Sequence, residues 1–199
     1  IQCKCMNHSG HLEIIICRKR MQKRKKIMIE AVVYTSNTGE TEKYAKTFAV
    51  KAGFPCVKLE ETSTLEKGAH IIYFGWIFAD TIQGYDKACR KYDIPCVCGV
   101  GMSTAGTKNR EIRKATGLGE EVVLFSLRGG LHMDRLKGIH RLILSAVRKA
   151  NIRQLEGKER TAQEEDDLAL WKKGGSRFDE NALLPVLGWY QSCLKKNHE

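Results

Sequence analysis

The chain has 199 residues, enough for one domain with a sizeable core and some surplus at its ends. It is 42% hydrophobic and 29% charged, which is typical of a soluble globular protein, whereas its formal net charge of +11 raises the question of a nucleic-acid partner. No apolar run reaches the ~20 residues of a membrane span, and there is no repeat or low-complexity tract, so we expect a cytoplasmic protein.

Residues 1–27 are unusually basic. They contain eight Lys or Arg against one acidic residue, so the other 172 residues carry a net charge of only +4. We interpret this segment as a disordered arm or as the product of an over-extended reading frame that truly starts at Met21 or Met28. Two alternatives stay open: an arm that binds nucleic acid or an anionic membrane, and a metal site formed by Cys3, Cys5, His8 and His11.

From residue 28 onward, apolar strand-like runs alternate with helical patterns, which is typical of an α/β fold with a parallel sheet. We predict five strands, at 28–34, 55–59, 70–76, 95–100 and 121–127. We predict helices at 42–52, 83–92, 109–116, 136–153 and 181–194, with a poor helix within 60–68. The five alternations predict a doubly wound, five-stranded parallel sheet, whose ligands lie beyond the carboxyl ends of the strands.

The chain beyond the last predicted strand and helix forms a C-terminal helical extension. We divide the chain into a basic arm at 1–27, a domain at 28–153 and this extension at 154–199. The charged run at 157–167 is interpreted as a linker or an exposed helix start. The final helix has apolar residues that we expect to pack on the domain, namely Leu183, Leu184, Leu187 and Trp189. A tail that binds a partner is the alternative.

The eight cysteines show no C-x-x-C spacing of the kind found in zinc or iron–sulfur sites. Cys96 and Cys98 occupy alternate positions of a predicted buried strand, where cysteine behaves as a small hydrophobic residue. We therefore expect reduced thiols, with Cys96 and Cys98 packed in the core, and no zinc or iron–sulfur site of the C-x-x-C type.

A polar stretch, Ser36-Asn-Thr-Gly-Glu-Thr41, separates the first predicted strand from the first helix. Main-chain amides at a helix start favour an anion, hydroxyl groups add donors, and Gly39 lets the backbone approach closely. The stretch has no Lys or Arg and lacks both the G-x-x-x-x-G-K-[ST] and the G-x-G-x-x-G spacings. It therefore predicts a site for one terminal phosphate, the alternative being an N-capped helix start without a ligand.

This stretch resembles the [ST]-x-T-G-x-T phosphate loop of flavodoxins, and the resemblance extends over about residues 28–150. The segments 74–84 and 127–138, and the tail at 177–189, are similar to flavodoxin-domain proteins related to the flavodoxin-type protoporphyrinogen oxidases. The resemblance implies a flavodoxin-like fold and noncovalently bound FMN. It places the phosphate on residues 36–41 and the isoalloxazine between the second and third loops.

The later loops contain residues that suit a flavin. Trp76 ends the third predicted strand, where its ring is placed to stack on the flavin, with Phe78 or Tyr85 as substitutes. The third loop, 99–104, offers a glycine-rich backbone and Met102 for contacts with the flavin edge. The cofactor contacts that the resemblance implies are Ser36, Asn37, Thr38, Gly39, Glu40, Thr41, Trp76, Ile77, Phe78, Ala79, Gly101, Met102 and Ser103.

No side chain is expected to act as a catalytic acid, base or nucleophile, because the flavin itself takes up electrons. We interpret His132 and His140 as surface histidines rather than as a proton relay. The segment 101–107 lacks the tyrosine that flavodoxins usually bring onto the flavin, and the body is mildly basic where flavodoxins are acidic. We therefore expect neither a strongly reducing carrier nor an acidic docking face for redox partners.

The expected function is that of an FMN-binding redox protein. It is either an oxidoreductase that acts on a small molecule such as a porphyrinogen or quinone, or an electron carrier between redox partner proteins. The alternative from another class is a non-redox binding module whose basic arm holds nucleic acid. The excess charge is confined to one segment, and no aromatic residues are interleaved with it, which argues against that alternative.

Overall fold

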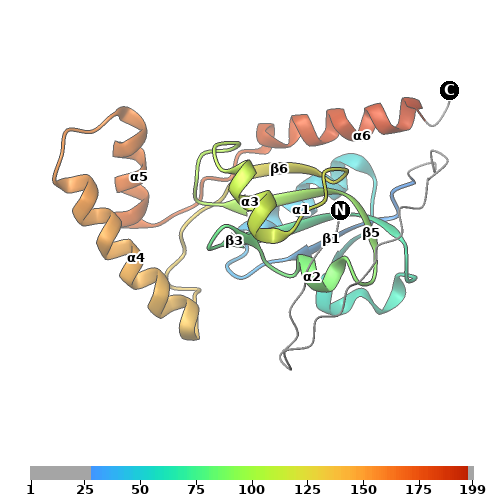
Figure 1. The fold of residues 1–199 in the computed structure, drawn as a ribbon, viewed down its shortest axis with the longest axis horizontal. Helices are drawn as coiled ribbons and strands as arrows, with labels where there is room; N and C mark the ends of the chain where they lie inside the picture. Colours follow the sequence, from blue (N-terminus) through green and yellow to red (C-terminus); the bar gives the residue numbers. More distant parts are fainter. Residues whose placement is uncertain (1–27, 197–199) are drawn as a thin grey trace.

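The computed structural model describes residues 28–196, which form an α/β fold built on a parallel sheet (Figure 1). The parallel strands are β1 (Ala31–Thr35), β2 (Cys56–Lys58), β3 (His70–Phe78), β5 (Asp93–Gly101) and β6 (Val123–Arg128). They lie in the order β2-β1-β3-β5-β6, and β4 (Thr81–Ile82) folds back antiparallel on the end of β3. The predicted α/β class with a parallel sheet is confirmed.

Helices flank the sheet and extend beyond it. They are α1 (Glu40–Ala52), η1 (Leu59–Thr64), α2 (Tyr85–Ala88), α3 (Asn109–Thr116), α4 (Gly138–Glu156), α5 (Ala162–Lys173), η2 (Glu180–Leu183) and α6 (Leu184–Lys196). The prediction of a helix at 109–116 is confirmed, whereas the helix predicted at 83–92 is only one turn long. The sequence analysis missed α5 as a full helix, although a capping box formed by Thr161 and Glu164 marks its start.

The two faces of the sheet bury separate apolar cores, because successive strand residues point to opposite faces. One core packs α2, α3 and η1 against strand residues such as Tyr73 and Val97. The other core packs α1 and α6 against residues such as Phe74, whose ring centroid lies 5.7 Å from that of Phe48. Cys96 and Cys98 both lie fully buried in this second core, so the prediction that they pack as small hydrophobic residues is confirmed.

The C-terminal helix α6 packs on the α1 side of the sheet, as predicted. Leu183 is fully buried, Leu187 and Trp189 are partly buried, and the Tyr190 ring meets Phe54 edge to face at 5.0 Å. Leu184 was also expected to be buried, but its side chain is 61% exposed. It begins α6 about 100° around the helix axis from its buried neighbour and therefore faces solvent.

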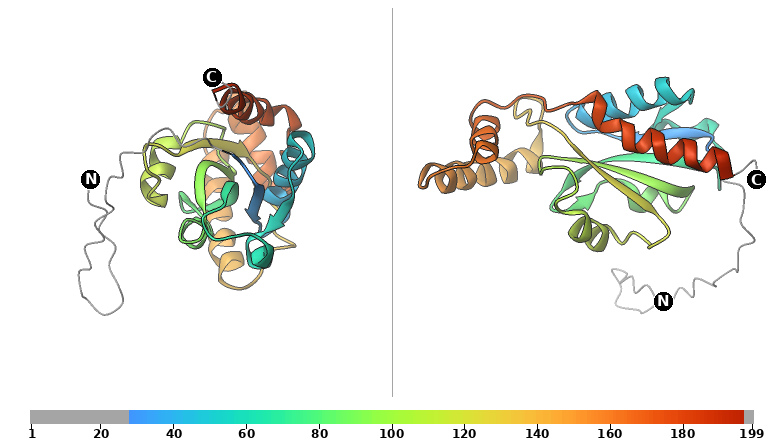
Figure 2. Two further views of the ribbon diagram at one scale, coloured as in Figure 1. Left: turned by 90° about the vertical axis from the view of Figure 1, so that its right-hand side faces the viewer. Right: turned by 90° about the horizontal axis from the view of Figure 1, so that it is seen from above.

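The helices α4 and α5 form a hairpin that projects from one end of the sheet (Figures 1 and 2). The helix predicted as the last of the α/β unit, α4, does not cover the sheet; it packs mainly on α5 and contains no buried residue. The face that it would cover is occupied by α6, which arrives after the hairpin. No helix within residues 28–196 is both long and apolar enough to cross a membrane.

Residues 1–27 lie outside the described part of the chain, and so do the predicted basic arm and its nucleic-acid and metal alternatives.

Candidate functional site

A cavity lies at the carboxyl ends of the central strands. This is the point of the sheet where β1 and β3 are neighbours and the chain reverses its winding direction, a common ligand site in open α/β sheets. The predicted site residues that line the cavity are Asn37, Thr38, Glu40, Thr41, Trp76, Ile77, Phe78, Gly101 and Met102.

Four predicted contact residues do not line the cavity. Ser36 and Gly39 shape the loop beneath it, since the Ser36 hydroxyl accepts a hydrogen bond from the Gly39 amide at 3.1 Å. Ala79 lies in the turn between β3 and β4, where its φ is +48°. Ser103 is exposed on the loop that follows β5. These four residues lie beside the cavity rather than in its lining, and their contacts with a cofactor stay predictions.

The polar loop 36–41 leads directly into α1. Gly39 adopts a φ of +97°, where an L side chain is strained, and no side chain caps the helix. The Lys43 amide is the first to bond within the helix, to the Gly39 carbonyl at 3.0 Å. The amides of the first turn before it therefore lack intrahelical acceptors and point toward the cavity end of the helix, where an anion is favoured.

A cation lies beside this loop, although the loop itself contains none. The Arg135 guanidinium donates a hydrogen bond from Nη1 to the Thr38 carbonyl at 3.0 Å. The same nitrogen lies 3.4 Å from the position that a side chain on Gly39 would occupy. Sequence reasoning missed this residue because Arg135 follows the loop by almost a hundred positions, and only the fold brings the two segments together.

Glu40 is a buried carboxylate that joins three segments of the chain. Its Oε1 accepts a hydrogen bond from His132 Nε2 at 2.9 Å, and its Oε2 accepts one from Ser176 Oγ at 2.9 Å. The side chains of Glu40 and His132 are only 10% and 16% exposed. The interpretation of His132 as a surface histidine is therefore wrong: it lines the cavity and its ring nitrogen bonds to a buried carboxylate.

Aromatic side chains form the opposite wall of the cavity. Trp76 and Phe78 are two residues apart on β3 and so share one face, with ring centroids 5.7 Å apart. His140, from the first turn of α4, meets both rings edge on at 5.3 and 5.1 Å. His140 is thus also no simple surface residue, and α4 closes this side of the cavity.

Tyr85 does not belong to this wall, although it was considered as a substitute for Trp76. Its ring is 8% exposed and packs near Tyr73 in the core on the other face of the sheet. Burial raises the pKa of Tyr85 to about 12. Among the three aromatic candidates, the structure brings Trp76 and Phe78 to the cavity and leaves Tyr85 in the core.

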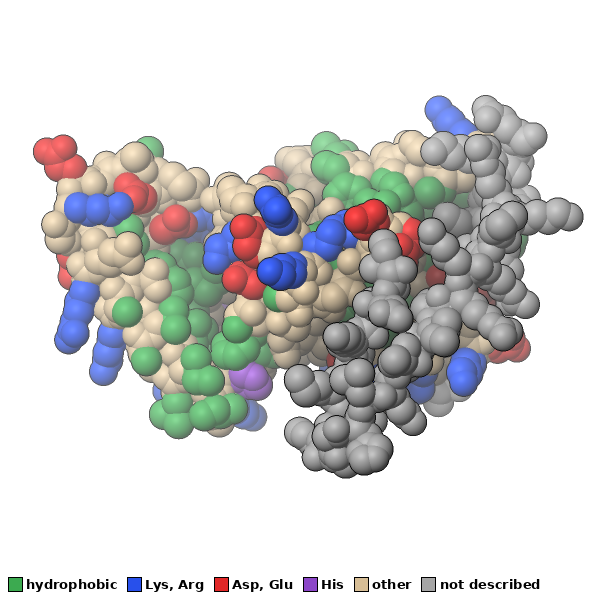
Figure 3. All heavy atoms as spheres, viewed as in Figure 1, with side chains coloured by type: hydrophobic (Ala, Val, Ile, Leu, Met, Phe, Trp, Pro, Cys, Tyr) green, Lys and Arg blue, Asp and Glu red, His purple; other side chains and the backbone are tan. Residues whose placement is uncertain are grey.

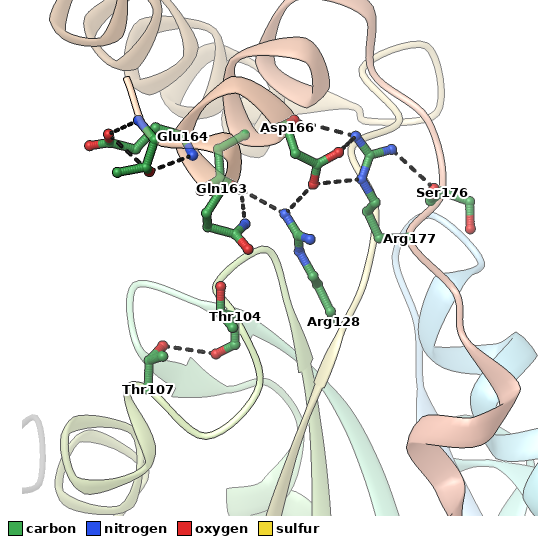
Figure 4. A network of polar contacts seen from close by, with 10 residues as sticks. Thr104, Thr107, Arg128, Gln163, Glu164, Asp166, Ser176 and Arg177 are labelled. Atoms are coloured by element: carbon green, nitrogen blue, oxygen red, sulfur yellow. Dashed lines mark hydrogen bonds and ion pairs between the residues drawn. The ribbon is translucent and has the colours of Figure 1, made fainter. Parts of the chain in front are cut away.

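An ionic network fixes the hairpin beside the cavity (Figure 4). Arg128, at the end of β6, contacts Asp166 at 2.8 Å and Asp167 at 2.6 Å. Arg177 holds Asp166 from the other side at 2.7 Å, and this contact lowers the pKa of the Asp166 carboxyl. The network ties α5 both to the sheet and to the segment before α6, so it sets where α4 lies over the cavity.

The cavity thus combines helix-start amides, hydroxyl groups and one arginine at one end with aromatic and aliphatic side chains at the other. Within residues 28–196 there is no cluster of three or more potential metal ligands. No protein-family model matches the sequence, and no curated protein is similar to it.

Proposed function

We propose that this chain is a flavodoxin-like protein that binds FMN and carries out redox chemistry. The strand order supports this proposal: without the two-residue β4, β2-β1-β3-β5-β6 corresponds to the order 2-1-3-4-5 of flavodoxin-like folds. In that fold FMN binds at the switch point between the first and third strands, which is where the cavity lies.

The observation that carries the proposal is the pairing of a phosphate-type loop with an aromatic wall in one cavity. The unsatisfied amides at the start of α1, the buried Thr41 and the Arg135 guanidinium suit a terminal phosphate. The Glu40 carboxylate also lines the cavity, and its two oxygens accept hydrogen bonds from His132 and Ser176 of the same chain. The residues present therefore fit the phosphate end of FMN.

The other end of the cavity suits an aromatic ring system. Trp76 and Phe78 would pack on the isoalloxazine, and such aromatic pairs contribute about 0.5–1.5 kcal/mol beyond burial of area. Met102 and the backbone of Gly101 line the adjoining side. When bound, FMN would supply the capacity to accept and donate electrons, and the chain would orient it and shield it from water.

Between the two redox functions, the structure favours an oxidoreductase that acts on a small molecule such as a porphyrinogen or quinone. His140 and Leu144 of α4 close one side of the aromatic wall, which leaves less of it open to a partner protein. An electron carrier between redox partner proteins is the competing proposal. Stepwise reduction of the FMN-loaded protein separates the two, since a carrier would stabilise a one-electron step whereas a two-electron oxidoreductase would not.

The proposal is tested by titrating the purified full chain with FMN and, separately, with riboflavin, which lacks the phosphate. We expect FMN to bind with quenched flavin fluorescence. Because the phosphate would gain charge-assisted hydrogen bonds, FMN should bind about tenfold or more tightly than riboflavin. Equal affinities would contradict the role assigned to residues 36–41, and no binding of either compound would contradict the proposed function.

A further inference from the structure

The helix α4 has an exposed apolar stripe that the proposed flavin site does not use. One side of α4 meets α5 and the cavity through residues such as His140 and Leu144. The outward side carries large aliphatic side chains on successive turns, and their exposed fractions are 62% for Ile139, 69% for Leu142, 41% for Ile143 and 39% for Val147. Their spacing of i, i+3, i+4 and i+8 places them on one side of the helix.

Single exposed hydrophobic residues are normal on protein surfaces, but a continuous stripe indicates an interaction site. Ala146 and Ala150 are also exposed and continue the stripe toward the end of the helix. Figure 3 shows hydrophobic side chains gathered over the lower end of α4, with Lys and Arg side chains beside them on its outer edge. The stripe lies on the hairpin that projects from the body, so the rest of the described chain leaves it open.

The charges of the hairpin are unbalanced on this side. Its acidic residues, Glu159 apart, form ion pairs within the chain: Glu156 with Lys172, Glu164 with Lys158, Glu165 with Arg160, Asp166 with Arg177 and Asp167 with Arg128. The basic residues on the outer edge of α4 have no ion pair with any of residues 28–196, and these are Arg141, Lys149 and Arg153. The edge is therefore left positive for an external anionic partner.

The basic edge borders the apolar stripe directly. Lys149 follows Leu142 by seven residues, and Arg153 follows Ala146 by seven, so each basic residue lies two turns along the same line of the helix. An apolar stripe beside Lys and Arg is the pattern of helices that lie in a membrane interface. A second copy of the chain is a poorer fit, because pairing the stripes would bring two positive edges together.

We propose that α4 docks this protein on an anionic membrane surface. The aliphatic side chains at 139, 142, 143 and 147 enter the boundary between headgroups and acyl chains, and Lys149 and Arg153 contact anionic headgroups. A bilayer requires no matching groove, which suits a helix on a projecting edge. The same helix contributes His140 to the cavity, so docking places the mouth of the cavity near the membrane.

The proposal is tested by sedimenting the full chain with vesicles of phosphatidylcholine alone or of phosphatidylcholine mixed with phosphatidylglycerol. We expect binding to the mixed vesicles and little to the neutral ones. The double variant Ile143→Asp, Val147→Asp should bind about tenfold or more weakly, because it removes apolar insertion and adds negative charge. Val50→Asp is the matched control, since Val50 is 84% exposed on α1 and should leave binding unchanged.

A second pair of variants separates the charges of α4 from general basicity. Lys149→Glu with Arg153→Glu should weaken binding about tenfold or more, whereas Lys67→Glu with Lys114→Glu, which makes the same change in net charge on the body, should not. Circular dichroism checks that each variant is folded. FMN affinity should be the same in all of them, so failure of flavin binding and failure of membrane binding are recorded independently.

Three results would overturn the proposal. The α4 variants could bind mixed vesicles as tightly as the parent chain, which would assign binding to another basic segment. The parent chain could bind neutral and mixed vesicles equally, or neither of them. It could instead form a dimer that Ile143→Asp abolishes, without any vesicle binding, which would make the stripe an interface between two copies.

Discussion

Replacing Glu40 by alanine should destabilise the fold strongly, although an acidic residue in the first turn of a helix is usually a minor contributor. The Glu40 carboxylate is buried and accepts hydrogen bonds from His132 and Ser176, both at 2.9 Å. The variant leaves both donors without this acceptor in a largely water-free position. It also separates α1 from the two segments that approach it from the C-terminal half of the chain.

The magnitude follows from the two lost contacts. A hydrogen bond to a charged group contributes about 1.5–3 kcal/mol, and the two bonds share one acceptor and are not additive, so we expect a loss of about 3 kcal/mol. For a domain of this size, that corresponds to a fall in Tm of about 6–12 °C. Glu40→Gln keeps one acceptor oxygen and the volume of the side chain, and should lose about half as much.

Thermal unfolding followed by circular dichroism measures this loss, and Glu42→Ala is the matched control. Glu42 occupies the same first turn and the same helix dipole, but it forms an exposed i,i+4 pair with Lys46. Its removal should cost only about 0.5 kcal/mol. If Glu40→Ala and Glu42→Ala lower Tm equally, the buried pairing of Glu40 does not stabilise the fold as argued.

Further variants test the loop, the turn before α2 and the ionic network. Arg135→Met should weaken FMN binding about tenfold in a fluorescence titration, because it removes the cation beside Thr38. Gly84→Ala should lower Tm well beyond Gly106→Ala: both residues have a φ of +82°, but a side chain at Gly84 would lie 2.6 Å from the Thr35 hydroxyl, whereas Gly106 has open space. Arg177 lowers the pKa of Asp166, so their contact stabilises the fold at pH values above the ordinary pKa of aspartate. This stabilisation is lost as the pH falls through the lowered pKa. Near-ultraviolet circular dichroism should show that change, and Arg177→Met should abolish it.

The sequence was a good guide to the sheet, because its strands are continuous apolar runs with turn residues between them. The five predicted strands match β1, β2, β3, β5 and β6 within a few residues. The small β4 was missed because two residues are too few to show the alternating pattern of a strand. The turn before it has positive φ angles at Ala79 and Asp80, and neither residue type predicts such a turn.

The helices after the sheet were harder to place. Apolar periodicity predicts that a helix is amphipathic, but it does not say which surface the apolar side covers. The sequence therefore marked α4 correctly as a helix, while its position on a projecting hairpin depends on Arg128, Asp166 and Arg177, which are far apart in the chain. The helix α6 covers the sheet in its place through its own apolar residues.

Some residues of the candidate site could be predicted from the sequence and others could not. Local sequence was sufficient for the loop 36–41, because a strand, a glycine and a helix follow one another directly. It was not sufficient for Arg135, His132 and His140, which reach the cavity only when the segment after β6 folds back across it. Residue spacing in the sequence does not predict the pairing of Glu40 with His132, because the two residues are far apart in the chain. The histidine was assigned to the surface for that reason.

The absorbance spectrum of the purified full chain, recorded before and after incubation with FMN and removal of excess flavin, tests the central claim most directly. We expect a yellow protein with the absorbance bands of oxidised flavin, at about one FMN per chain, and loss of those bands on reduction. A protein that stays colourless after incubation with FMN would contradict the account.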